Sequence, residues 1–443
     1  ALTCAGGFMV CGILLPLLPN APLFILLRTI QGLFSGALPP LLMTVALRFL
    51  PPSIKLYGLG AYALTATFGP NVAPSLAAFW TDDVSWMFMF WQVVPAILIS
   101  MLFIGWGLPQ DPIHLDRFKQ IDLFGMITGC SGMAFLIIAI TQGGRLDWFE
   151  SPLFNGLLSS AFVCLTIFLI NEWFHPLPLF KLQMLERSNF SYGLMALAVV
   201  LVLVLALAGS ALPSNFFGKV EGFRTVQFAP LALIIGLPQL IITPLVAALL
   251  SLRWVDCRWL IAFGIVLMIS ASLMGMQITS DWSRQNFWAI QLLQAIGLPS
   301  IILPLLMSAT SVVAPPEGHY ASAMFNTVRG FSSIAAGVLV EWFINDREQF
   351  HSNVLVNNVA NRPWLISTPV SEQASSSIPL LHDGSISNTE NIAGFITLLK
   401  HQAIVLSLAD SYLLMTGFAV LLLLLTVWLP KRVWPPQTLF NLQ

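Results

Sequence analysis

The chain has 443 residues, of which 57% are hydrophobic and only 9% are charged, and its formal net charge is -1. A soluble domain carries about 25% charged residues, so a chain this poor in charge cannot cover a surface that faces water. These values, with a mean hydropathy of +0.83, exclude a soluble protein, and the lack of a basic tail or stripe gives no reason to expect a nucleic-acid partner.

Apolar segments long enough to cross a bilayer occur along the whole chain. A membrane-spanning helix needs about 20 mostly apolar residues. The segments that meet this requirement are twelve, at residues 1–18, 22–49, 55–80, 86–107, 121–142, 153–172, 189–212, 225–251, 258–276, 286–312, 319–344 and 402–429. They predict an all-α polytopic membrane protein. Residues 346–401, rich in Ser and Asn, are predicted to form a solvated loop with local helix near 392–401.

The basic residues at the segment ends predict the orientation. An even number of spans puts both ends of this chain on one side, and cytoplasmic loops carry the excess of Lys and Arg. Ten basic residues lie on one side: Arg48, Lys55, Arg117, Lys119, Lys181, Arg187, Arg253, Arg258, Lys431 and Arg432. The short loops of the other side hold four: Arg145, Lys219, Arg224 and Arg284. Both termini of this chain are therefore predicted to be cytoplasmic, and loop 346–401 external.

A faint repeat links the two parts of the chain. PPLLM at 39–43 matches LPLLM at 303–307, and Pro51-Pro52 matches Pro315-Pro316, both at an offset of 264 residues. Parallel repeats of this kind are typical of two-bundle transporters with the substrate site between the halves. The alternative is chance, because Leu and Pro are common in this chain.

A permanent charge stands inside the second segment. Arg28 lies near the start of 22–49, and Gln31 adds a second polar group one turn deeper on the same face. A charge at bilayer depth costs about 2.5–3.5 kcal/mol on insertion scales, so such residues usually face a bundle interior or a watery cavity. Gly32 and Gly36 form a small-xxx-small pair that would let another helix approach closely. The alternative is that Arg28 snorkels to the outer lipid headgroups.

Two motifs resemble signatures of a known transporter family. Arg28, Gln31 and Gly32 form R-x-x-Q-G, which resembles the fourth-helix signature of the major facilitator superfamily. LTATFGPNVAPSLAAFW at 64–80 resembles the fifth-helix signature of the drug antiporters in that superfamily. The two motifs fall on the second and third segments of this chain. The resemblance therefore implies that two helices precede residue 1.

The second motif departs from the family pattern at one place. Gly69 and Pro70 match its Gly-Pro, whereas Ala73 and Pro74 stand where a pair of glycines is usual. Those glycines allow close packing at the interface between the halves, so the departure weakens the antiporter assignment. Pro70 removes one backbone hydrogen bond and is expected to kink its helix. Taken alone, Pro70 is explained equally well by a merely kinked helix.

Four further stretches resemble the fourteen-helix branch of the drug:proton antiporters. They are IDLFGMITGCSGMAFLIIAITQGGRLDWFESP at 121–152, LPSNFFGKVEGFRTVQFAPLALIIGLP at 212–238, SAMFNTVRGFSSIAAGV at 322–338 and LKHQAIVLSLADSYLLMTGFAVL at 399–421. The resemblance implies the major facilitator fold, with two pseudo-symmetric helix bundles and a two-helix insert. It implies twelve transmembrane helices in this chain and fourteen in the full protein.

The same resemblance divides the chain into three parts. Residues 1–107 correspond to helices 3–6 of the family and are the remnant of the N-terminal bundle. Residues 108–188 are the two-helix insert. Residues 189–443 are the C-terminal bundle, including the external loop 346–401.

Charged residues in or near the last two segments are candidates for proton coupling. Arg329 resembles a family-typical Arg in the inner part of its helix. A carboxylate at Asp410, in the outer half of the last segment, could cycle a proton, and facing water is an equal alternative. Glu341 more simply faces water at the outer edge. With Arg28, Gly69 and Pro70, the residues Arg329 and Asp410 complete the predicted coupling and conformational set.

These features predict a secondary active exporter. The resemblance implies that drugs or other lipophilic and amphipathic compounds leave against inward protons. Residues 1–107 would rock against residues 189–429 around a midplane cavity. Arg28, Gln31 and Gly32 would line this cavity from one half, and Gln291 and Gln294 from the other.

Three rival functions stay open. The same fold could export one defined metabolite or a siderophore, or the chain could be a non-transporting scaffold or sensor. A membrane enzyme is the third, but no Walker A, GxSxG or HExxH signature occurs. No enzyme activity, cofactor or metal is predicted. The predicted partners are a small-molecule substrate, protons and lipid in a bacterial inner membrane, with a periplasmic adaptor and an outer-membrane channel where the source has two membranes.

Overall fold

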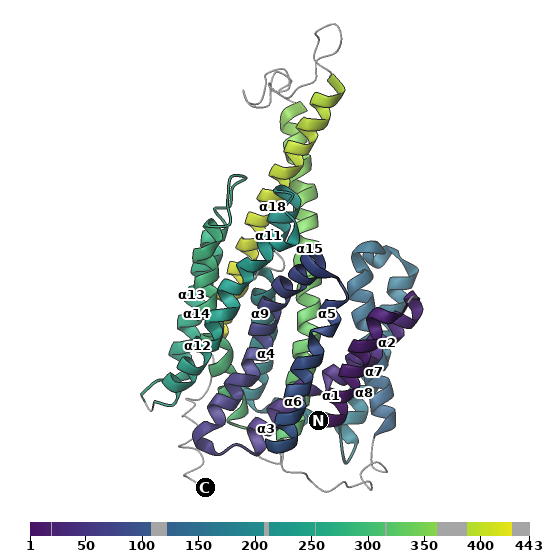
Figure 1. The fold of residues 1–443 in the computed structure, drawn as a ribbon, viewed down its shortest axis with the longest axis vertical. Helices are drawn as coiled ribbons and strands as arrows, with labels where there is room; N and C mark the ends of the chain where they lie inside the picture. The colour runs from purple at the N-terminus through teal and green to yellow at the C-terminus, as the bar shows by residue number, and fades with distance from the viewer. Residues whose placement is uncertain are drawn as a thin grey trace.

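The part of the chain that the structure describes is helical. The computed structural model describes residues 1–18, 20–107, 122–207, 212–252, 254–314, 317–360 and 388–427, and no strand occurs among them. In its described residues, each segment that the sequence predicted to span the membrane falls on helix (Figure 1). The all-α prediction is therefore confirmed. Some residues used above lie outside the described ones: Arg117, Lys119, Arg253, Pro315, Pro316, Lys431 and Arg432.

The first 107 residues contain α1 (Leu2–Leu14), α2 (Ala21–Gly36), α3 (Leu38–Arg48), α4 (Pro52–Phe79), α5 (Phe88–Trp91) and α6 (Val93–Gly107). The predicted span 22–49 is divided into α2 and α3 at Ala37. Pro39 and Pro40 explain the division, because neither has a backbone N–H to continue the hydrogen bonding of α2. The short helical turns η1 (Leu15–Leu17) and η2 (Trp80–Val84) follow α1 and α4.

The insert consists of α7 (Leu123–Gln142) and α8 (Pro152–Phe174), which pack against each other. Asp122 caps α7, since its carboxylate accepts the Gly125 N–H at 2.8 Å. The C-terminal part contains α9 (Ser188–Leu207), α10 (Leu212–Asn215), α11 (Thr225–Phe228), α12 (Leu233–Leu250), α13 (Cys257–Gly275), α14 (Asn286–Thr310), α15 (Gly318–Ala360) and α18 (Asn388–Val427). The short turns here are η4 (Gly143–Arg145), η5 (Trp148–Glu150), η6 (Leu182–Glu186), η7 (Phe216–Val220) and η8 (Ala229–Ala232).

Nine helical segments among the described residues are long and apolar enough to cross a membrane. Two of the other predicted spans are shorter apolar helices, Leu2–Leu17 and Ser188–Val202. The third is α4, which has 28 residues but is less apolar than the nine. It packs against α3, α12 and α14, so much of its surface meets protein. The count of twelve spans stays a prediction.

The two halves pack through equivalent pairs of helices. α3 contacts α15, and α4 contacts α14. Adding the repeat offset of 264 to α3 and α4 gives residues 302–312 and 316–343, which coincide with the end of α14 and the start of α15. The end of α14 is thus the equivalent of α3, and the start of α15 is the equivalent of α4. The α3–α15 contact and the α4–α14 contact are therefore equivalent to each other. The predicted pseudo-symmetry of the two bundles is present in the structure.

The predicted loop 346–401 is wrong at its start, whereas the local helix predicted near 392–401 is confirmed. α15 continues as helix to Ala360, and α18 begins at Asn388. The two helices pack side by side and rise above the other helices (Figure 1). Composition predicted a loop here because these residues are too polar to form a membrane-spanning segment. A helix outside the membrane needs one apolar stripe rather than a fully apolar surface.

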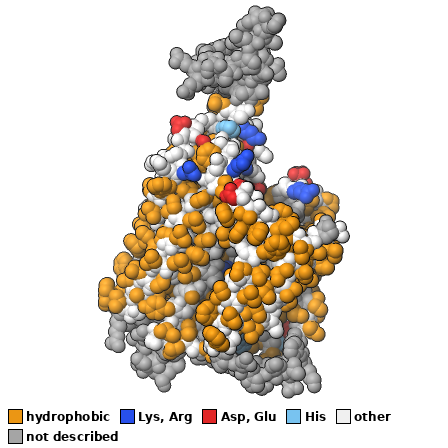
Figure 2. Space-filling model, in the orientation of Figure 1, with side chains coloured by type: hydrophobic (Ala, Val, Ile, Leu, Met, Phe, Trp, Pro, Cys, Tyr) orange, Lys and Arg blue, Asp and Glu red, His pale blue; other side chains and the backbone are white. Residues whose placement is uncertain are grey.

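Hydrophobic side chains cover most of the described surface on the face shown in Figure 2. Charged side chains gather above this apolar zone, where α15 and α18 rise (Figure 2). Exposed residues of the apolar zone include Leu33, Phe162 and Ile241, each more than 70% exposed. Large exposed apolar surface of this kind marks contact with a membrane or with another protein, which agrees with the membrane assignment.

Candidate functional site

Two polar side chains of α15 hydrogen-bond α4 across the contact between the halves. Arg329 donates from Nη1 to Thr65 Oγ1 at 2.7 Å and from Nη2 to the Thr65 carbonyl at 2.6 Å. One turn away, Tyr62 donates its hydroxyl to Asn326 Oδ1 at 3.1 Å. The Arg329 guanidinium also lies 5.8 Å from the centre of the Tyr62 ring. These four residues form the axial contact.

The axial contact joins residues that are equivalent in the repeat. Thr65 and Arg329 are 264 positions apart, and so are Tyr62 and Asn326. This separation equals the offset of the sequence repeat. A residue lies beside its own equivalent only near the axis that relates the two halves. The axial contact therefore marks the pseudo-twofold axis.

Neutral oxygen atoms satisfy the guanidinium of the axial contact. The Thr65 hydroxyl accepts from Arg329 and donates to the Tyr62 carbonyl at 2.7 Å. No carboxylate pairs with Arg329 among the described residues. A second contact between the halves lies nearby, where Ser322 donates to the Pro40 carbonyl at 2.8 Å. The halves are thus joined by hydrogen bonds that need no buried ion pair.

Arg28 and Gln31 lie on one face of α2, as predicted. Arg28 Nη1 donates to Gln31 Oε1 at 2.9 Å, and the guanidinium lies 4.8 Å from the centre of the Phe90 ring. Gln31 is buried against Gly12 of α1, whereas Arg28 is exposed. The side chain of Arg28 therefore bends toward α5 and the deeper amide of Gln31.

The glycines singled out by the sequence do not pack against other helices in the described part of the chain. A Cβ added at Gly32, Gly36 or Gly69 would meet nothing within 4 Å. The expected close approach of a helix at Gly32 and Gly36 is therefore not seen. α4 remains helical through Pro70.

A different glycine brings α4 and α12 together. A Cβ at Gly236 of α12 would lie 2.9 Å from Val72 and 3.5 Å from Asn71 of α4. Asn71 is fully buried, and its amide donates to the Thr67 carbonyl at 2.6 Å. The small residue needed for close packing of the halves is thus on α12, where the motif comparison did not look.

Gln291 and Gln294 of α14 are both fully buried. The amide of Gln291 has no hydrogen-bond partner among the described residues. Neither side chain is exposed in this conformation. That these glutamines line a cavity from one half while Arg28 and Gln31 line it from the other stays a prediction.

Asp410 is held by an ion pair. Its Oδ2 lies 2.7 Å from both Arg347 Nη2 and His351 Nε2. Arg347 and His351 lie on the part of α15 that composition assigned to a loop. The candidate proton carrier therefore stands at the base of the helical extension, about one-third exposed, and not in apolar surroundings. Glu341 is exposed, as expected.

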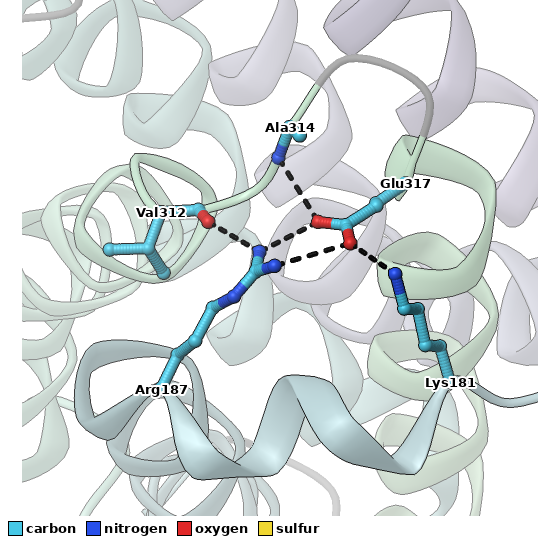
Figure 3. Close-up of polar contacts among 5 residues, drawn as sticks. All are labelled: Lys181, Arg187, Val312, Ala314 and Glu317. Atoms are coloured by element: carbon cyan, nitrogen blue, oxygen red, sulfur yellow. Dashed lines mark hydrogen bonds and ion pairs between the residues drawn. The ribbon is translucent and has the colours of Figure 1, made fainter.

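A charged cluster that the sequence analysis missed ties the insert to α15. Glu317 accepts from Arg187 at 2.7 Å and from Lys181 at 2.6 Å (Figure 3). Arg187 also donates to the Val312 carbonyl, and Glu317 accepts the Ala314 N–H. The hydrogen bond from Arg187, followed by that from Lys181, outweighs burial and lowers the pKa of Glu317 to about 2. Glu317 follows the Pro315-Pro316 pair directly, and that position was the available signal.

Comparison with known proteins agrees with the motifs. The model of the Major Facilitator Superfamily matches residues 1–338. An uncharacterized MFS-type transporter, YhcA of Bacillus subtilis, is 24% identical over 80% of this chain and 64% of its own length. The fatty acid resistance protein FarB of Neisseria gonorrhoeae is 23% identical over 96% of this chain and 82% of its own length. The multidrug export protein EmrB of Escherichia coli is 23% identical over 92% and 77%. The chain thus spans less than two thirds of the length of YhcA, 82% of that of FarB and 77% of that of EmrB.

Proposed function

The chain belongs to the major facilitator superfamily, because the family's model matches residues 1–338, and from this premise we propose that it is a secondary active exporter. Its cargo is drugs or other lipophilic and amphipathic compounds, exchanged for protons by alternating access. The names of two relatives, a multidrug export protein and a fatty acid resistance protein, support this cargo class. Because these relatives extend beyond this chain, the activity of the whole protein is part of the proposal.

The axial contact is the observation that carries the proposal. Alternating access needs a contact between the halves that closes in one state and opens in the other. Arg329 and Thr65 meet through hydrogen bonds to neutral oxygens, each worth roughly 1.5–3 kcal/mol when one partner is charged. A contact of that size can break within a transport cycle. Both residues can then find water as an alternative partner.

The path for cargo runs between the halves. Arg28, Gln31 and Gly32 line it from α2, on the side of the N-terminal bundle. Gln291 and Gln294 join it from α14 when the halves move apart, which would also give the Gln291 amide a polar partner. An unpartnered buried amide costs about 1–3 kcal/mol, so the conformation that buries Gln291 is the less relaxed one for this side chain.

Proton coupling involves Asp410 through its pairing with Arg347 and His351. Entry of one proton down 100 mV releases about 2.3 kcal/mol, enough to bias a contact of this kind. Gly69 and Pro70 of α4 provide the local adaptability that bending requires. The proposed orientation puts the termini of this chain and the Glu317 cluster in the cytoplasm, and the α15–α18 extension outside the inner membrane of a bacterium. There it could meet a periplasmic adaptor and an outer-membrane channel.

Ethidium efflux from cells that express the full protein tests this function. We expect efflux above that of empty cells, lost when an uncoupler is added. Arg28→Ala should slow it about tenfold, the loss of one charged hydrogen bond. Arg145→Ala, an exposed charge of the insert, is the control and should change nothing. Efflux that continues unchanged when the uncoupler is added would overturn proton antiport. Normal efflux in Arg28→Ala would show that Arg28 does not line the cargo path.

A further inference from the structure

The insert carries a surface groove that the path between the halves does not use. It has a volume of about 640 Å³, within the range of small-molecule sites. α8 forms one wall, and η6 with its neighbours forms the other. Its lining includes Leu169, Ile170, Trp173 and Phe174 of α8 and Leu182 and Glu186 of η6.

The groove faces the bilayer. Positions 166, 169, 170, 173 and 174 form one stripe of α8 at helical spacing. Phe174 is 80% exposed and Ile170 56% exposed. α8 packs against α7 and the short turns η5 and η6, and it lies at the edge of the molecule (Figure 1). Trp173 and Phe174 end the span, at the depth where aromatic side chains meet the lipid headgroups.

Glu186 is the one charged residue among those that line the groove, and it has no counter-ion among the described residues. Glu186 has no hydrogen bond or ion pair from its side chain among the described residues. Its neighbours in sequence, Lys181 and Arg187, are both bound to Glu317 (Figure 3). Glu172, an acidic residue beside the groove, is buried within α8 and accepts the Phe180 N–H at 2.8 Å. The cluster around Glu317 thus leaves Glu186 as a free negative charge at the end of an apolar groove.

We propose that this groove binds a lipophilic organic cation dissolved in the cytoplasmic leaflet. The apolar tail lies along Leu169 and Leu182, the cationic head pairs with Glu186, and the face of Trp173 attracts the same charge. Charge complementarity selects a cation over an anion with the same tail, because an anion would meet Glu186 unscreened. The proposal rests on the proposed export function for the cargo class and on the proposed orientation for the leaflet. It adds a peripheral capture site outside the path between the halves.

Photo-crosslinking in bilayers tests the site without requiring transport. The full protein is placed in phosphatidylcholine nanodiscs with dodecyltrimethylammonium that carries a diazirine near the end of its tail. Dodecyl sulfate with the same diazirine is the matched anion. We expect the cation to label the peptides around residues 166–174 and 182–185, and the anion to label them about fivefold less, the size of one half-exposed ion pair. Glu186→Gln should remove this difference, and Leu169→Trp should reduce labelling by both probes.

Glu150→Gln is the matched control, an exposed glutamate at the other end of the insert, and it should keep the preference for the cation. Equal labelling by cation and anion, or an unchanged preference in Glu186→Gln, would overturn the proposal and leave a groove filled by ordinary lipid. Ethidium efflux is measured on the same variants. A charge-selective groove in a protein without efflux would reject the export function and keep the site, whereas efflux without selective labelling would reject the site alone.

Discussion

Arg329 donates two hydrogen bonds to Thr65, the residue that is its equivalent in the internal repeat. Equivalent residues of two related halves touch only where the axis passes between them. The same separation of 264 positions relates Tyr62 to Asn326. The axial contact is therefore formed by two positions of the repeat, each of which occurs once in either half and carries a different side chain there. One half supplies hydroxyl groups, and the other supplies a guanidinium and an amide.

Weakening the axial contact should alter efflux without unfolding the chain. Thr65→Val removes the hydroxyl but leaves the carbonyl, and Arg329→Lys keeps the charge but loses the fork of donors. We expect each change to slow ethidium efflux and the double variant to be no slower than Arg329→Lys alone. The two effects share one interaction, with a coupling energy of about 1 kcal/mol. Rates of efflux in the four proteins measure this coupling.

Thr141→Val on the exposed face of the insert is the control for the loss of a threonine hydroxyl. It should leave efflux unchanged. If the effects of Thr65→Val and Arg329→Lys simply added, the two residues would act independently and the axial contact would not be a unit.

The Glu317 cluster should stabilise the fold in a way that depends on pH. The pKa of the Glu317 carboxyl, about 2, lies below the ordinary value of 4.5, so ionised Glu317 favours the folded state. This stabilisation is fully present above about pH 4.5 and is lost as the pH falls toward 2. At neutral pH, Glu317→Gln should cost about 1–3 kcal/mol, toward the low end because Lys181 and Arg187 are partly exposed.

Thermal unfolding of the purified protein at a series of pH values measures this contribution. The gap in unfolding temperature between wild type and Glu317→Gln should be constant near neutral pH and shrink under acid. Glu221→Gln, an exposed carboxylate, should show no gap at any pH. A gap that persists at the acid end would mean that packing, rather than ionisation of Glu317, stabilises the cluster.

The sequence predicted the helices well because each needs a long apolar run, which a single chain displays openly. The repeat offset of 264 residues could also be predicted, since PPLLM and LPLLM occupy equivalent places in the two halves. Arg329 was singled out because it resembles a family-typical Arg in the inner part of its helix. Its partner was not, because Thr65 looks like any helical threonine until the hydrogen bonds between α4 and α15 are known. Partners across helices depend on register and rotation, and local composition carries neither.

The helical extension formed by α15 and α18 was missed by the sequence analysis for a different reason. Residues 346–360 are polar, so a search for apolar runs ends before them. Arg347 and His351 were therefore assigned to a loop, and Asp410 lost its partners in the prediction. Gly236 was missed because a glycine motif was sought on α4, while the close approach depends on the facing helix α12.

Asp410→Asn tests whether the ion pair at the base of the extension serves proton coupling. The pair is about one-third exposed, so its loss should cost less than about 1 kcal/mol of stability. Under the proposed function, the dependence of efflux on external pH should flatten in Asp410→Asn. His351→Gln, which removes the titratable ring but keeps Asp410 and Arg347, should flatten it less. An unchanged pH profile in Asp410→Asn would leave the residue a structural role only.

Packing of α13 against α14 should tolerate no side chain at Gly264. A Cβ there would lie 2.7 Å from Ile301 Cγ1 and 2.8 Å from the Gly297 carbonyl oxygen. The backbone of α14 cannot move aside alone, so the helices must separate, at a cost of about 1–3 kcal/mol. Gly156→Ala in α8 is the matched change, since a Cβ there meets nothing within 4 Å. It should be neutral or raise stability by about 0.5–1 kcal/mol, because alanine favours helix. Thermal unfolding of both variants measures the contrast, and equal midpoints would show that α13 and α14 are not in the close contact described.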